Sequence, residues 1–237
     1  MINQLFSLFN EILSYTGRIN YYDFLKALLM AYKYIEPTYP LMNLVNKLSG
    51  LMNLLERASA ELNSEIIEYY KDTLSVIDSR EVYPLLVDNL GLAEIVEISK
   101  RFSLVLSFFI INEEATTHYW KTLFKVSTLR EFARIFGAQL LNFPDKTIDN
   151  ISVNIDNSEG FSTPDELSSF LYNRVAMRLI NILSGVSSKQ MLLISDHGYD
   201  IIYYKSKYIP CHGNLCKKFG GKLVLSKIAP IIIIRRN

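Results

Sequence analysis

Acidic side chains follow three of the predicted strands, at the point where each strand ends. The strands and their acids are 82–87 with Asp88, 148–155 with Asp156, and 191–195 with Asp196 and His197. In open α/β sheets ligands bind beyond the carboxyl ends of the strands, so these side chains should meet at one edge. Carboxylate oxygens and imidazole nitrogens are the usual ligands of zinc and manganese in hydrolytic sites. The pattern predicts a divalent-metal site with Asp196 and His197 as its clearest ligands, although a single acid at a strand end is more often a cap or a turn former.

The elements that would carry these acids alternate between strands and helices. The expected order is strand 82–87, helix 92–99, strand 104–111, helix 129–136, strand 148–155, a long helix after Thr163, strand 191–195 and a buried strand at 228–234. The long helix is the best marked, because Thr163 can cap it, Pro164 suits its first turn and Glu166 can complete a capping box. This alternation predicts an α/β fold with a mostly parallel sheet and flanking helices.

Residues 1–80 differ from the rest because they show only helical patterns. Apolar residues recur three or four positions apart in three stretches, and a fourth helix is expected at 64–73. Pro37 and Pro40 should separate the second helix from the third. We therefore expect a helical region at 1–80 followed by an α/β domain at 81–237. The helices either pack on that domain or bind a protein partner.

The composition excludes several classes of protein. The chain has 237 residues, of which 49% are apolar and 21% charged, and its formal net charge is +1. A near-neutral chain has no global field that draws in nucleic acid, so nucleic-acid binding has only weak support. No apolar run approaches the ~20 residues that span a bilayer, and no signal peptide is visible, which favours a cytoplasmic protein without membrane contact. Cys211 and Cys216 are expected to be free thiols, because a zinc site built with His212 would lack a fourth ligand.

Four segments carry a resemblance to a known superfamily. In chain order they are Leu86-Val87-Asp88-Asn89-Leu90, Asn154-Ile155-Asp156, Leu192-Leu193-Ile194-Ser195-Asp196-His197-Gly198-Tyr199, and Cys211-His212-Gly213 followed by 225–234. The third segment resembles the Ser-Asp-His-Gly strand end of the alkaline-phosphatase-like superfamily of phosphatases, phosphodiesterases and sulfatases. Within that superfamily, residues 83–235 are most similar to PglZ domains. The Asp-His-Gly strand end is the most specific of the four segments, and the others gain weight from their order.

The resemblance implies a metal-dependent phosphoesterase with two adjacent ion sites. It assigns Asp88, Asp196 and His197 to one ion, Asp156 and His212 to the other, and the nucleophile to Thr117 or Thr116. Of the two hydroxyl groups, that of Thr117 is preferred. The implied cofactor is one or two divalent ions, zinc or manganese. The implied substrate is a phosphodiester or a nucleotide.

The chain also departs from the family pattern at the second ion site. Many members place a histidine four residues after the acid that corresponds to Asp156, and here that position is Gly160. Glu159, Asp200 or His118 could supply the missing ligand, or the second site could be lost.

This departure keeps other hypotheses open. A rival is a catalytically reduced binding or scaffold protein in a multi-component assembly of the phage-defence kind. A phosphomutase or a sulfatase is a third possibility, although a sulfatase needs a Cys or Ser nucleophile that Thr116-Thr117 does not offer. Lys217, Lys218 and Lys222 form a basic cluster that is either a solvated turn or a guide for a phosphate backbone.

Overall fold

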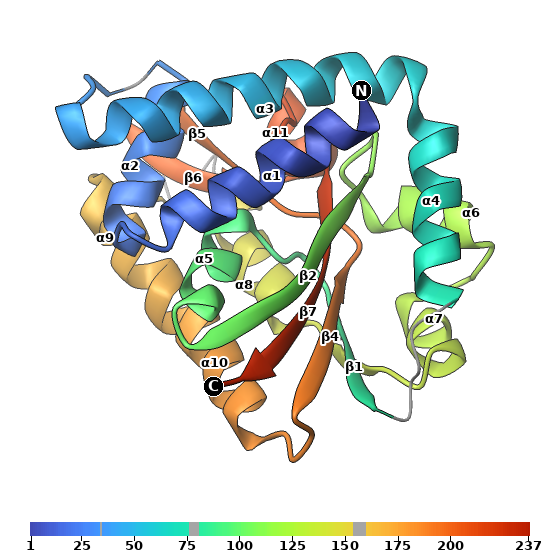
Figure 1. Cartoon of the computed structure of the whole chain (residues 1–237). Helices are drawn as coiled ribbons and strands as arrows, with labels where there is room; N and C mark the ends of the chain where they lie inside the picture. The colour runs from blue at the N-terminus through green and yellow to red at the C-terminus, as the bar shows by residue number, and fades with distance from the viewer. Residues whose placement is uncertain (34, 76–80, 154–159) are drawn as a thin grey trace.

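A computed structural model describes residues 1–33, 35–75, 81–153 and 160–237 (Figure 1). The helices are α1 (Ile2–Thr16), α2 (Tyr21–Ala31), α3 (Met42–Glu61), α4 (Asn63–Ser75), α5 (Leu92–Ser99), α6 (Thr117–Phe124), α7 (Leu129–Ile135), α8 (Phe143–Ser152), α9 (Pro164–Leu171), α10 (Met177–Gly185) and α11 (Gly213–Lys218). The strands are β1 (Val82–Val87), β2 (Phe102–Ile111), β3 (Gln139–Leu141), β4 (Gln190–Ser195), β5 (Asp200–Tyr204), β6 (Lys207–Cys211) and β7 (Ile228–Arg236). The predictions of an α/β fold and a helical N-terminal region are confirmed.

The main sheet has five strands in the order β2-β7-β4-β1-β3, and it is mixed rather than mostly parallel. Strand β1 runs parallel to β3 and β4, whereas β7 runs antiparallel to both β4 and β2. The expectation of a mostly parallel sheet is therefore wrong. After β4 the chain forms the β5–β6 hairpin and α11 without a helical crossover over the sheet. It then enters β7 and runs back, and an antiparallel neighbour needs no crossover.

The reversal of β7 leaves one property of the predicted sheet intact. Because β7 is antiparallel to both of its neighbours, β2 points in the same direction as β4, β1 and β3. These strands consequently end at the same edge of the sheet, and the loops that follow them lie together. Figure 1 shows this edge beside the β5–β6 hairpin and α11.

The strand predicted at 148–155 is also wrong in its described part, because α8 occupies Phe143–Ser152, and residues 154 and 155 lie outside the described residues. Pro144, Ile148 and Ile151 are buried at the i, i+4, i+7 spacing of one helix face. Over a stretch this short, alternating apolar residues fit both a strand and a helix, and the proline in the first turn favours the helix. The parallel strand at this place in the sheet is β3, which the sequence patterns did not reveal.

Most of the elements that the sequence patterns predicted are present, α9 above all, whereas α6, β5, β6 and α11 were not predicted. Thr163 caps α9, and its side chain and that of Glu166 form the reciprocal hydrogen bonds of a capping box. Five residues of π-helix (Tyr172–Ala176) join α9 to α10, so the predicted long helix continues to Gly185. In the N-terminal region, α2 ends before Pro37 and Pro40, and α4 covers the helix predicted at 64–73.

The N-terminal helices share one hydrophobic core with the sheet. Buried side chains of α1 and α3 belong to the same contiguous cluster as those of β2, β4 and β7. The ring centroids of Phe9 in α1 and Phe109 in β2, for example, lie 4.7 Å apart. The boundary near residue 80 thus separates two kinds of structure that pack together, and whether they fold as separate units stays a prediction. None of the described helices is both long and apolar enough to cross a membrane.

We expect Phe9→Ala to destabilise the whole protein, because the substitution opens a cavity where α1 meets β2. The loss should be about 3–5 kcal/mol. Denaturant unfolding would be followed by helical circular dichroism and by fluorescence of Trp120, the single tryptophan, which is buried in α6. Both signals should shift together. Ile135→Ala, at a side chain that is 60% exposed, is the control and should change little. Two separate transitions would show that the helices fold independently.

Candidate metal centre

Two neighbouring strands deliver Asp88, Asp196 and His197 to one point. Val87 in β1 pairs with Ser195 in β4, so the residues that follow these two strands emerge side by side. Ligand atoms of Asp88, Asp196 and His197 all lie within 4.8 Å of one another. Asp196 and His197 are fully buried and Asp88 is mostly buried. This first ligand group contains the donors that a zinc or manganese ion takes from a protein.

Thr117 adds a hydroxyl group to the first ligand group. Its Oγ1 donates a hydrogen bond to Asp196 Oδ2 at 2.7 Å and lies 3.4 Å from His197 Nε2. Thr116 instead caps α6, where its Oγ1 accepts from the Tyr119 amide. Asn112, after β2, fixes this loop because its Nδ2 donates to the carbonyl oxygens of both Thr116 and Asp196 at 2.8 Å. The structure therefore brings Thr117, and not Thr116, against the carboxylate of Asp196.

The imidazole of His197 is oriented by its own backbone. Its Nδ1 lies 3.0 Å from the carbonyl oxygen of Gly198, which can only accept, so Nδ1 carries the proton of this hydrogen bond. Nε2 then faces Asp196 Oδ2 and Thr117 Oγ1, each at 3.4 Å. A histidine that ligates a metal commonly donates its other ring nitrogen to a carbonyl in this way.

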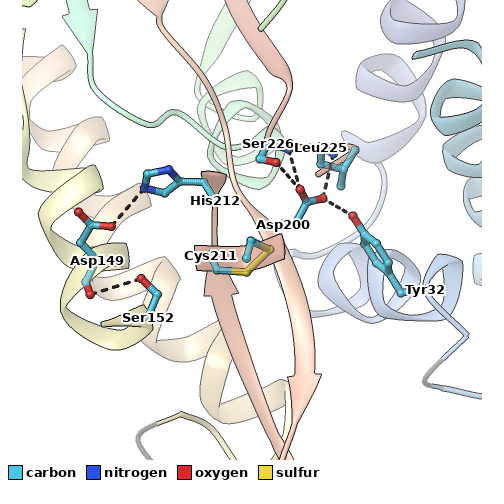
Figure 2. The surroundings of a disulfide bond; sticks show 9 residues. Tyr32, Asp149, Ser152, Asp200, Cys211, His212, Leu225 and Ser226 are labelled. Carbon is cyan, nitrogen blue, oxygen red and sulfur yellow. Dashed lines mark hydrogen bonds and ion pairs between the residues drawn. A yellow bond between two sulfur atoms is a disulfide. The ribbon is translucent and has the colours of Figure 1, made fainter. Parts of the chain in front are cut away.

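A second ligand group adjoins the first on the side of α8. His212 Nε2 lies 3.1 Å from Asp145 Oδ1 and 3.2 Å from Asp149 Oδ1, and Figure 2 shows the contact with Asp149. The rings of His197 and His212 are 4.4 Å apart, and ligand atoms of Asp145, His197 and His212 lie within 4.8 Å of one another. The two groups of candidate ligands therefore share His197.

The charges of the two groups are strongly coupled. Burial and the nearby carboxylates of Asp196 and Asp145 raise the pKa of Asp88 to about 9. Burial opposes the charge on His212, but its hydrogen bonds with Asp145 and Asp149 outweigh this effect and raise its pKa to about 10. For Asp145, burial favours the neutral form, yet the bond with His212 holds the pKa below its usual value. At neutral pH the negative charge around Asp88, from Asp196 and Asp145, is therefore not fully offset by positive charge.

Two buried polar atoms support a metal at this place. Asp88 Oδ1 and His212 Nδ1 have no hydrogen-bond partner among the described residues. A buried polar atom without a partner is costly and calls for an explanation such as a bound ion or water. Asp88 Oδ1 in the first group has no partner within the described part of the chain, and the carboxylates and imidazoles of both groups are donors that a divalent cation can bind.

The predicted site residues have different outcomes. Asp88, Asp196, His197 and Thr117 lie together, and His212 lies beside them. His212 contacts Asp145 and Asp149, neither of which was predicted. Its predicted partner Asp156 and the possible substitute Glu159 lie outside the described residues. Of the proposed substitutes, His118 is exposed, and Asp200 accepts hydrogen bonds from Leu225, Ser226 and Tyr32 instead.

The sequence reasoning missed Asp145 and Asp149, the two acids that contact His212. They lie four residues apart, which places them on the same face of α8. Pro144 followed by Asp145 is a helix-start signal, so a helical assignment of this stretch would have found the pair. The error in the secondary structure of 148–155 and the missed ligands thus have one cause.

The expectation of free thiols is wrong, because Cys211 and Cys216 form a disulfide (Figure 2). Cys211 ends β6, and the turn into α11 brings Cys216 back to a Cα–Cα distance of 5.2 Å, within the usual range for a disulfide. His212 lies between the two cysteines in the sequence, and its carbonyl oxygen accepts a hydrogen bond from the Cys216 amide. Lys217 and Lys218, at the end of α11, are exposed.

Comparison with models of known protein families finds none that matches the chain, and a search of curated proteins finds no significant match. The likeness to PglZ domains therefore depends on the motif residues themselves.

We expect Asp88→Asn to stabilise the metal-free protein and to abolish metal binding at the first group. The folded-state pKa of Asp88 is raised, so the stability tied to its protonated form is complete below about pH 4 and is lost as pH rises toward 9. The asparagine stays neutral throughout. At pH 8 with a chelator present, the variant should gain about 2 kcal/mol, or about 6 °C in Tm.

Asp149→Asn is the matched control for this prediction. It makes the same chemical change at a half-exposed partner of protonated His212, so it should lower Tm or leave it unchanged. Thermal unfolding at pH 5 and pH 8 measures both variants, and the gain of Asp88→Asn should shrink at the lower pH. A Tm for Asp88→Asn at or below that of the wild type at pH 8 would contradict the like-charge account.

Proposed function

We propose that the protein is a metal-dependent phosphoesterase in which Thr117 is the nucleophile. The observation that carries the proposal is the hydroxyl of Thr117, 2.7 Å from a carboxylate oxygen of Asp196 inside a buried group of metal-type ligands. This contact satisfies one oxygen of a buried carboxylate, and it also places the hydroxyl beside the ligands that could activate it. A threonine hydroxyl needs such activation for nucleophilic attack, because it is a weak nucleophile at its ordinary pKa.

The residues divide into two candidate ion sites. Asp88, Asp196 and His197 would hold one divalent ion beside Thr117, and Asp145, Asp149 and His212 would hold a second. This assignment of the second site replaces Asp156 as the partner of His212. A divalent ion in such a site lowers the pKa of a hydroxyl group and stabilises the charge of an in-line phosphoryl transfer.

The protein's own groups account for the orientation of the attack. Asp196 Oδ2 accepts the hydrogen bond of the Thr117 hydroxyl and would take its proton as the oxygen attacks phosphorus, and the proton would then leave with the released alcohol. Thr117 is the first residue of α6, where the partial positive charge of the helix end favours an anionic oxygen. Its oxygen then forms a bond to phosphorus while the ester bond of the leaving group breaks. Water hydrolyses the resulting phosphothreonine, which regenerates the hydroxyl. The preference for a phosphodiester or nucleotide substrate rests on the likeness to PglZ domains.

One observation favours a second candidate, a catalytically reduced binding or scaffold protein. Protonated His212 already pairs through Nε2 with both Asp145 and Asp149, so these three residues form an ion-pair network without a metal. A protein that retained one ion, or none, would keep the fold through this network and lose turnover.

We expect Thr117→Ala to lower turnover of bis-nitrophenyl phosphate by about 1,000-fold or more, with zinc or manganese affinity little changed, because only the attacking oxygen is lost. Thr117→Ser keeps a hydroxyl and should keep measurable activity. Thr116→Ala is the control, since it removes the α6 cap at about 1 kcal/mol of stability but leaves the reacting group.

The outcomes of this experiment separate the two candidates. Full activity in Thr117→Ala would refute the nucleophile. A wild-type protein that binds metal through Asp196 but turns over neither diesters nor monoesters would support the scaffold.

A further inference from the structure

Helix α2 is tied to the loop that follows His197 through a buried carboxylate. The hydroxyl of Tyr21 in α2 donates to Glu94 Oε1 at 2.8 Å, and the hydroxyl of Tyr199 donates to the same oxygen at 2.9 Å. Glu94 is fully buried, and its Oε1 accepts both of these hydrogen bonds. Tyr199 lies only two residues after the candidate metal ligand His197.

A second buried carboxylate, that of Asp200, also connects the segment after His197 to the end of α2. Asp200 is fully buried and accepts hydrogen bonds from the Leu225 amide at 2.9 Å and the Ser226 amide at 3.1 Å. It also accepts from the hydroxyl groups of Ser226 and of Tyr32, which caps the end of α2 (Figure 2). Asp200 thus joins the loop after His197, the loop before β7 and α2.

Gly198 directly precedes these two anchors, and hydrogen bonds hold its peptide at both the amide and the carbonyl. Its amide donates to the Ser226 carbonyl at 3.0 Å, and its carbonyl accepts from His197 Nδ1 at 3.0 Å. A Cβ atom at this position would lie 3.0 Å from the Leu225 carbonyl oxygen. Because Tyr199 and Asp200 follow Gly198 directly in the chain, a shift of either anchor would bear on the carbonyl that fixes the His197 ring.

We propose that Tyr21 with Glu94 and Tyr199, and Tyr32 with Asp200, are positioning residues that hold the Gly198 carbonyl and thereby keep His197 in the Nδ1-protonated tautomer, with Nε2 free to bind a metal. The N-terminal helices are then part of the metal centre. The metal-binding consequence rests on the proposed function, whereas the tautomer does not.

The test combines Tyr32→Phe and Tyr199→Phe, singly and together, because each removes one hydroxyl and keeps its ring. Nitrogen-15 correlation spectra of the metal-free protein at pH 8 report the tautomer of His197, which is one of only three histidines. We expect the Nδ1-protonated form to dominate in the wild type and a mixture of tautomers in the double variant. Competition with a coloured chelator should show cobalt affinity about tenfold weaker, in the range for groups that orient a metal ligand.

Two controls separate positioning from stability. Tyr15→Phe removes a hydroxyl from the same helical layer, where it donates to the Pro40 carbonyl. Leu183→Ala opens a cavity in α10, away from the loop, and lowers stability. Neither should change the tautomer or the cobalt affinity.

Each outcome is decisive. An unchanged His197 tautomer in the double variant, or an equal change in Leu183→Ala, would overturn the inference. A wild-type protein that binds no cobalt would refute the proposed metal centre, and the tautomer measurement would still decide the positioning of His197.

Discussion

The local structure depends on a concentration of buried negative charge at one edge of the sheet. Asp88, Asp196 and Asp145 face a common point, and His212 is the charged group that partly offsets them. Without a further cation the fold holds Asp88 neutral, as its raised pKa indicates. Removing carboxylates from water is unfavourable unless positive charge or hydrogen bonds compensate. Such a group lowers stability, and the metal site that we propose would compensate for this cost.

The sheet topology is what brings the acids together. Strands β1 and β4 are parallel neighbours in register, so Asp88 and Asp196 emerge side by side, and β3 leads into the helix that carries Asp145. The Asp88 amide donates to the Leu141 carbonyl and the Asp145 amide to the Asp88 carbonyl, which closes the same edge by backbone hydrogen bonds. The reversed strand β7 does not disturb this edge, because the loop before it supplies the Ser226 carbonyl that holds Gly198.

The N-terminal helices contribute more than a cover for the sheet. They share its hydrophobic core, and α2 donates two phenol hydroxyl groups to carboxylates that flank the Asp-His-Gly turn. A helical layer attached to a turn in this way would restrict the geometry of His197, the metal ligand we propose, without touching the ion. Buried polar groups stabilise the fold only when their hydrogen bonds are made, and an unpaired group is costly. These hydrogen bonds therefore also fix how the helical layer packs on the sheet.

The sequence by itself determined the helical N-terminal region, the capped helix at Thr163, and the strands that end at Asp88 and Asp196, because apolar periodicity and capping chemistry are local. It also indicated that Asp196, His197 and Asp88 would meet, since parallel strands end at one edge. Only the tertiary structure decided the direction of β7, the helix at 143–152, the Cys211–Cys216 pair and the partners of His212. These features depend on contacts between segments far apart in the chain, and short alternating stretches fit more than one local structure until such contacts select among them.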